Sequence, residues 1–152
     1  MLITINYLAF QDQLKLKSAE GKSWIFDPLR RKYLVAGPEE LVRQLVIFYF
    51  IQQLAYNKNR IKVEMGLKVN TLARRCDILV YDNSVQAFLL VECKAPKVDI
   101  TQATFEQIAR YNMPLQVPFL MVTNGIKTYC CQIHYDTQSF TFLDHIPPYP
   151  TL

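Results

Sequence analysis

The stretch from Arg74 to Pro96 constrains the fold most, because it reads as two strands joined by a tight turn. Residues 75–82 and 87–95 are rich in β-branched, aromatic and aliphatic residues, and Asp82-Asn83-Ser84 between them is a turn cluster. A turn centred between Ser84 and Val85 aligns the two segments in one register. The sequence therefore predicts an apolar β-hairpin whose pairing can be read residue by residue.

In that register Asp77 lies opposite Glu92, and Lys94 shares the face of Glu92 because side chains alternate along a strand. Two carboxylates and one ammonium are then expected to converge at one end of the hairpin. Facing carboxylates repel one another, and buried charges are costly without partners. A hard divalent ion such as Mg²⁺ or Mn²⁺ would satisfy both carboxylates and leave positions for a substrate phosphate. The alternative is a purely structural ion cluster.

Further motifs accompany this hairpin in a fixed order along the chain. They are F-D-P-L-R-R-K-Y at 26–33, P-E-E-L-V-R-Q at 38–44, Q-I-A-R-Y at 107–111 and V-T-N-G at 122–125. Together with Asp77, Glu92 and Lys94 they resemble the PD-(D/E)XK nuclease superfamily. The more specific resemblance is to the N-terminal domain family of type I restriction enzyme R subunits, including its short stand-alone members. Cys76 stands where the superfamily's name has proline, which many members also lack.

The resemblance implies a restriction-endonuclease-like fold and Mg²⁺- or Mn²⁺-dependent hydrolysis of DNA. It implies that Asp77, Glu92 and the Cys93 carbonyl bind the metal and that Lys94 handles the attacking water. Glu40 and Gln107 would complete the site, although spacing alone favours a simple pair between Glu40 and Arg43. Glu39 is the neighbouring acid that could be taken for Glu40. The residues expected around this site are Arg43, Glu64 and Tyr111.

The charge of the chain is mildly basic, with a net charge of +4 and a pI near 8.9. Its basic clusters could bind phosphates, or they could be ordinary solvated faces. The candidates for nucleic-acid contacts are Arg30, Arg31, Lys32, Lys68, Arg74 and Arg75, and a further basic group is Lys58, Arg60 and Lys62. The same residues would serve an RNA nuclease. A non-catalytic nucleic-acid-binding or assembly module with an inherited nuclease fold is the alternative function.

The remaining properties restrict the class of protein. A chain of 152 residues is expected to form one domain, and no apolar run is long enough to cross a bilayer. The N-terminus lacks a signal-peptide pattern, so we expect a cytoplasmic protein with four free, buried cysteines rather than a zinc site. None of the glycines forms a phosphate-binding loop, so ATP-driven translocation is excluded. The chain would act alone, as a homodimer that cuts both strands, or with restriction-system subunits.

The order of elements predicts an α/β (α+β) domain with a mixed central sheet flanked by helices. We expect an N-terminal arm or hairpin over 1–36, a nuclease-like core over 37–145 and a tail over 146–152. The elements expected within the core are a helix over 38–56, a strand over 61–67 with a bulge at Gly66, a loop over 68–72, a helix from a cap at Asp99 to Tyr111, and strands over 118–123, 127–134 and 140–143.

Overall fold

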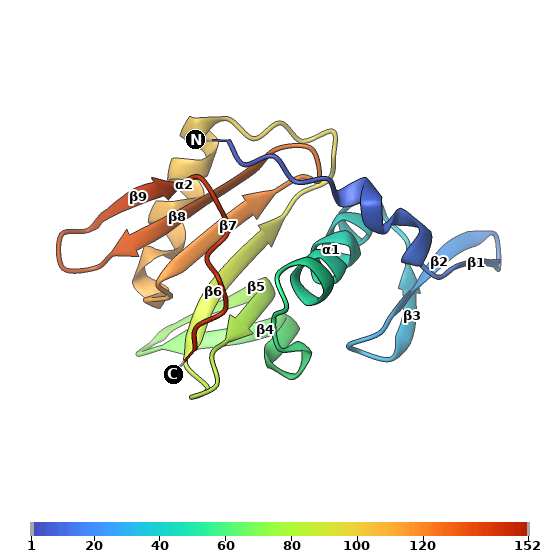
Figure 1. Ribbon diagram of the computed structural model, residues 1–152, viewed down its shortest axis with the longest axis horizontal. Coiled ribbons are helices and arrows are strands. Elements are labelled where there is room, and N and C mark those ends of the chain that lie inside the picture. The colour runs from blue at the N-terminus through green and yellow to red at the C-terminus, as the bar shows by residue number, and fades with distance from the viewer. Residues whose placement is uncertain (1, 152) are drawn as a thin grey trace.

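A six-stranded mixed sheet forms the centre of the computed structural model, which describes residues 2–151 (Figure 1). In spatial order its strands are β4 (Ile61–Val69), β5 (Leu72–Tyr81), β6 (Ala87–Cys93), β7 (Phe119–Thr123), β8 (Thr128–His134) and β9 (Ser139–Leu143). Only β6 and β7 are parallel, and helix α2 (Gln102–Asn112) lies in the crossover between them. Met1 of the predicted arm and Leu152 of the predicted tail lie outside the described residues.

The N-terminal region forms a second, smaller antiparallel sheet. A 3₁₀ helix, η1 (Tyr7–Gln13), precedes β1 (Leu16–Ala19), β2 (Lys22–Asp27) and β3 (Lys32–Val35). The predicted hairpin is present as β1 and β2, but the third strand was not predicted, because three of its four residues are exposed and its apolar pattern is short. Figure 1 shows helix α1 between this sheet and the central one.

Helix α1 (Pro38–Phe48) begins at the predicted residue. Gly37 is the N-cap, Pro38 occupies the first turn, and two acids follow it, as the helix dipole favours. The predicted end near Tyr56 is wrong. The helix widens into a π turn, η2 (Tyr49–Gln53), where the Leu54 N–H donates to the Tyr49 carbonyl at 3.1 Å. The left-handed φ of Ala55, 53°, then turns the chain away.

The two faces of the central sheet carry separate apolar clusters. On one face Val46, Ile47 and Phe50 of the α1–η2 helical segment pack among Ile78 and Val91 of the sheet. On the other face α2 covers a second cluster, formed by Phe105, Ala109, Leu79, Leu90, Leu120 and Val122. Strands β6 and β7 are therefore buried on both faces, which explains their continuous apolar sequences. The predicted α/β (α+β) class and mixed sheet are confirmed, and the arrangement is consistent with a nuclease-like fold.

The β5–β6 hairpin has the predicted register. Ile78 pairs with Val91 and Leu79 with Leu90, and a bulge between Val80 and Tyr81 changes the pairing only at the turn end. The preceding strands are longer than predicted. The predicted loop over 68–72 is only a two-residue turn, so β4 continues to Val69 and β5 starts at Leu72. The predicted bulge at Gly66 is also wrong, because pairing is regular there and the irregular residue is Glu64, with φ of 52°.

The start of α2 differs from the prediction. Thr101, not Asp99, is the N-cap, and its hydroxyl accepts a hydrogen bond from the Thr104 N–H at 3.1 Å. Asp99 instead pairs with Lys127 at 2.8 Å, a partner that local sequence could not reveal. All four cysteines are free and buried, as predicted. No helix within residues 2–151 combines the length and the apolar character needed to span a membrane.

Candidate active site

Asp77, in the middle of β5, and Glu92, at the end of β6, lie side by side where the pairing of the two strands ends. Their neighbours in the hairpin, Ile78 and Val91, are paired, and the Cys93 N–H donates to Asp77 Oδ2 at 2.7 Å. That hydrogen bond fixes the Asp77 carboxylate against the last residues of β6. The structure thus brings together two acids that the hairpin register placed opposite one another.

The environment of Glu92 favours its protonated form. The pKa of Glu92 is raised to about 7, chiefly by burial and next by the charge of Asp77, with a smaller contribution from a hydrogen bond to Asp77. The charge of Lys94 acts in the opposite direction and lowers this pKa. The charge of Glu39 acts in the same direction as Asp77. Among residues 2–151, no cationic side chain lies within 4.0 Å of the Glu92 carboxylate. The site therefore holds a half-buried carboxyl without a direct cationic partner.

Glu92 and Lys94 open into a cavity of about 330 Å³ beneath α2. Gln107 and Tyr111 of α2 line the same cavity, so the first and last residues of the Q-I-A-R-Y motif meet Glu92 and Lys94 there. The Lys94 N–H donates to the Thr123 carbonyl at 2.8 Å, which continues the β6–β7 pairing and fixes Lys94 at the cavity edge. Arg74 stacks on the Tyr111 ring, with its guanidinium carbon 4.2 Å from the ring centroid.

The V-T-N-G motif supports the loop that leads from Lys94 to α2. Asn124, which is buried, donates from Nδ2 to the Val98 carbonyl at 2.8 Å. Its Oδ1 accepts hydrogen bonds from the Ile126 and Lys127 N–H groups. One amide side chain thereby joins the β7–β8 turn to the crossover loop.

Arg43 joins Asp77 to a network of charges on the α1 side. Its guanidinium is buried and lies 3.6 Å from Asp77 Oδ1, 3.1 Å from Glu64 Oε1 and 3.4 Å from Glu40 Oε1. Burial opposes ionisation of Glu64, but Arg43, followed by Arg30 and Arg75, lowers the pKa of Glu64. The strained backbone of Glu64 is thus found where its carboxylate meets three arginines.

Asp27 is a buried member of this network that the sequence did not single out. Its Oδ1 accepts from the Leu29 and Arg30 N–H groups, and its Oδ2 lies 2.5 Å from Arg30 Nε. Burial by itself would raise the pKa of Asp27, but these hydrogen bonds and the charge of Arg30 have a larger effect and lower it. Arg30 then contacts both Glu40 oxygens, at 3.0 and 3.1 Å. The signal available in the sequence was Asp-Pro after a strand, which is typical of a side-chain-capped turn.

The family comparison extends over most of the site. Residues 38–147 match the family described as the type I restriction enzyme R protein N terminus (HSDR_N). The chain belongs to this family. A search of the curated proteins found no match. The matched range includes Asp77, Glu92, Lys94 and Gln107, whereas Asp27 and Arg30 precede it.

Within this type I restriction family domain, the structure separates the two acids at the start of α1. Glu40, predicted for the metal site, is held by Arg30, Arg43 and the Gln44 amide, which donates to Glu40 Oε2 at 3.1 Å. Glu39 is the acid whose charge reaches Glu92. Glu40 is thus joined to Asp77 through Arg43, and no direct contact links it to either hairpin acid in the described part of the chain.

The predicted nucleic-acid-contacting residues occupy different places. Arg30 belongs to the charge network, Arg75 pairs with Glu64 at 3.4 Å, and Arg74 covers Tyr111. Lys32 and Lys68 are exposed on β3 and β4. Arg31 lines a cavity away from Glu92, together with two lysines. The structure therefore does not gather these six residues into one surface.

The site offers a metal ion few side-chain ligands. Among residues 2–151, no three His, Cys, Asp or Glu side chains converge closely enough to form a metal site by themselves. The oxygen donors are the carboxylates of Asp77 and Glu92 and the backbone carbonyl of Cys93. Such a set fits Mg²⁺ or Mn²⁺, which bind few carboxylates and keep several waters, better than it fits zinc. A cation beside Glu92 would favour the carboxylate form that burial and the charge of Asp77 disfavour.

Proposed function

We propose that this domain is a Mg²⁺- or Mn²⁺-dependent nuclease of the PD-(D/E)XK superfamily that hydrolyses phosphodiester bonds in DNA. The observation that carries the proposal is the pair of adjacent carboxylates, Asp77 and Glu92, of which Glu92 shares one cavity with Lys94 and Gln107. The match to a restriction-enzyme family supports DNA as the substrate and restriction-system subunits as partners. Cutting both strands would require two copies or two successive binding events, because one site cleaves one strand.

Asp77 and Glu92 provide the oxygen ligands in this proposal. Asp77 is oriented by the Cys93 N–H and by Arg43, so its carboxylate needs little rearrangement to bind an ion. When a divalent ion is bound, it lowers the pKa of its water and screens the charge of the phosphate. Glu92 releases its proton on binding, because a nearby cation favours the carboxylate.

Lys94 and Gln107 act on the water and the phosphate. The Lys94 ammonium at the cavity edge can donate a hydrogen bond to the attacking water or to a phosphate oxygen as negative charge develops there. The Gln107 amide, which enters from α2, can accept a hydrogen bond from the same water or hold the lysine. The two side chains would therefore hold and orient the attacking water.

A non-catalytic nucleic-acid-binding module is the second candidate, and one observation favours it. Glu40, Glu64 and Asp77 all lie within ion-pair distance of arginines, so much of the acidic charge is balanced within the protein. Glu92 is the exception, and its lack of a direct cationic partner among residues 2–151 favours the metal-dependent enzyme.

A plasmid-nicking assay separates the two candidates. Wild-type protein with Mg²⁺ should convert supercoiled DNA to nicked circles, and Asp77→Ala and Lys94→Ala should reduce the rate by about a hundredfold or more. Asp12→Ala, at an exposed carboxylate of η1, should cut like wild type. Nicking by Asp77→Ala near the wild-type rate would refute the catalytic assignment. A parallel reaction with single-stranded RNA distinguishes a ribonuclease from a deoxyribonuclease.

A further inference from the structure

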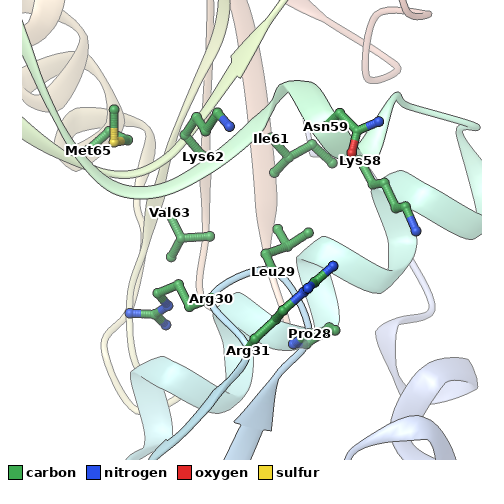
Figure 2. A pocket seen from close by; sticks show the side chains of 10 residues that line it. All are labelled: Pro28, Leu29, Arg30, Arg31, Lys58, Asn59, Ile61, Lys62, Val63 and Met65. Carbon is green, nitrogen blue, oxygen red and sulfur yellow. The ribbon is translucent and has the colours of Figure 1, made fainter.

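A second cavity, separate from the one beneath α2, lies between the β2–β3 turn and the start of β4. Its volume is about 430 Å³. Figure 2 shows Leu29 and Val63 between the two arginines of the turn, below, and Lys62, above. The cationic side chains at its rim include Arg31, Lys58 and Lys62. This cavity thus combines positive charges with an apolar floor.

The three rim cations have no acidic partner. Among residues 2–151, Arg31, Lys58 and Lys62 form no ion pair within 4.0 Å. Asp27 and Glu64, two acids of the adjoining charge network, pair with Arg30 instead. The rim therefore carries positive charge that nothing in the described chain neutralises, and an anion would supply the balance.

The backbone on both sides of the cavity is fixed. Arg31 has a left-handed φ of 54°, and its N–H donates to the Asp27 carbonyl at 2.7 Å. On the opposite side, the 3₁₀ turn η3 (Lys58–Arg60) is capped by Asn57, whose Oδ1 accepts from the Asn59 N–H at 3.0 Å. The hydrogen bonds at these two turns therefore hold the backbone around Arg31 and Lys58 in place.

The cavity borders the charge network of the candidate active site. Val63 lines the cavity, and the next residue, Glu64, turns into the network to meet Arg43 and Arg30. Arg30 itself lines the cavity, and Figure 2 shows its guanidinium directed away from Arg31. A single extended ligand could therefore contact the cavity and the region of Asp77 together.

The geometry points to this cavity as a binding site for a backbone phosphate of the nucleic-acid strand, at a distance from the scissile bond. The inference rests on the proposed nuclease function. Arginine and lysine are the usual donors to phosphate oxygens, and Leu29, Ile61 and Val63 offer an apolar surface to the adjoining sugar. The cavity would hold the strand in register without reading its sequence.

The test compares two double variants with the same change of charge. Lys58→Gln/Lys62→Gln removes two rim cations, and Lys17→Gln/Lys22→Gln removes two lysines of β1 and β2 that do not line the cavity. Binding of a fluorescent DNA duplex of about 20 base pairs is measured by anisotropy in EDTA at several salt concentrations. The rim variant should bind about tenfold more weakly near 0.1 M salt, with the slope of log K against log salt smaller by about 2.

A third variant, Arg31→Gly, removes the guanidinium at a position where glycine relieves the backbone strain. It should remain folded and reduce the slope by about 1. Equal affinities and slopes for the rim and control variants would overturn the inference. Binding of a free anion alone would also overturn it. In that case inorganic phosphate raises the Tm of the wild type but not of Lys58→Gln/Lys62→Gln, and the two proteins bind DNA equally.

These outcomes are independent of the proposed catalysis. If wild type nicks DNA and Asp77→Ala does not, but the rim variant binds like the control, the phosphate site alone fails. If the rim variant binds weakly but wild-type protein never nicks DNA, the nuclease proposal fails and the phosphate site stands.

Discussion

Replacing Glu92 with glutamine should stabilise the protein in a pH-dependent way. Folding raises the pKa of this carboxyl from 4.5 to about 7, through burial and the charge of Asp77. Between these pH values the folded state binds a proton that the unfolded chain has released. The stability of the wild type must therefore fall as pH rises through that window, and full stability is recovered only below about pH 4.5. Glutamine has no charge to lose and avoids this penalty.

The magnitude follows from the size of the shift. A shift of about 2.5 units corresponds to about 3 kcal/mol, since one unit is worth about 1.4 kcal/mol. The free energy of unfolding of Glu92→Gln should thus match the wild type near pH 4.5 and exceed it by about 2 to 3 kcal/mol at pH 8. For a chain of this size, that gain corresponds to a rise in Tm of about 5 to 10 °C.

Urea denaturation between pH 4.5 and 8.5 measures this difference, with all divalent ions removed by EDTA. Glu20→Gln, at an exposed turn, is the matched control and should give a difference near zero throughout. A Glu92→Gln difference that stays constant from pH 4.5 to 8.5 would refute the reasoning. So would a difference that decreases with pH, because the carboxylate would then be stabilised by the fold.

Three further predictions concern other parts of the site. Arg43→Met should lower the free energy of unfolding by about 3 kcal/mol in urea denaturation, because the buried guanidinium pairs with three partly buried acids and is the arginine partner of Asp77. Arg75→Met at the exposed end of the network should change it by less than about 0.5 kcal/mol, and equal losses would contradict the network. Gln107→Ala should reduce kcat for cleavage by about ten- to a hundredfold with KM unchanged, because Gln107 acts on the water or on Lys94 and not on substrate binding. A change in KM alone would contradict this role and indicate that Gln107 binds the substrate. Asp27→Asn should lower the free energy of unfolding by about 2 kcal/mol at pH 7, as measured by thermal melts. The loss should shrink as the pH falls below 3.8, because the lowered pKa of Asp27 contributes its full stability only above that value. A loss that persists at low pH would mean that packing, not charge, is responsible.

The hairpin could be predicted because its determinants are local. A turn cluster fixes the pairing of the residues beside it, and strand alternation then sets which side chains share a face. The position of Asp77 next to Glu92 followed from a turn centred between Ser84 and Val85. The observed bulge between Val80 and Tyr81 pairs Tyr81 with Ala87, so the turn is one residue shorter than that simple pairing would give.

The charge network could not be predicted in the same way. It joins β2, α1, β4 and β5, and the distances between these segments depend on tertiary packing. Glu40 has a good partner three residues away in Arg43, so spacing could not show that Arg30 would bind both of its oxygens. The predicted cap of α2 was wrong for a related reason. Asp99 forms an ion pair with Lys127, which is distant in sequence, and Thr101 is the N-cap instead.

The most direct test is a crystal structure of the protein soaked in Mn²⁺, with anomalous scattering used to place the ion. We predict one anomalous peak in contact with a carboxylate oxygen of Asp77, a carboxylate oxygen of Glu92 and the Cys93 carbonyl, and no peak there in Asp77→Asn crystals. A wild-type crystal saturated with Mn²⁺ that shows no peak between these two carboxylates would contradict the account.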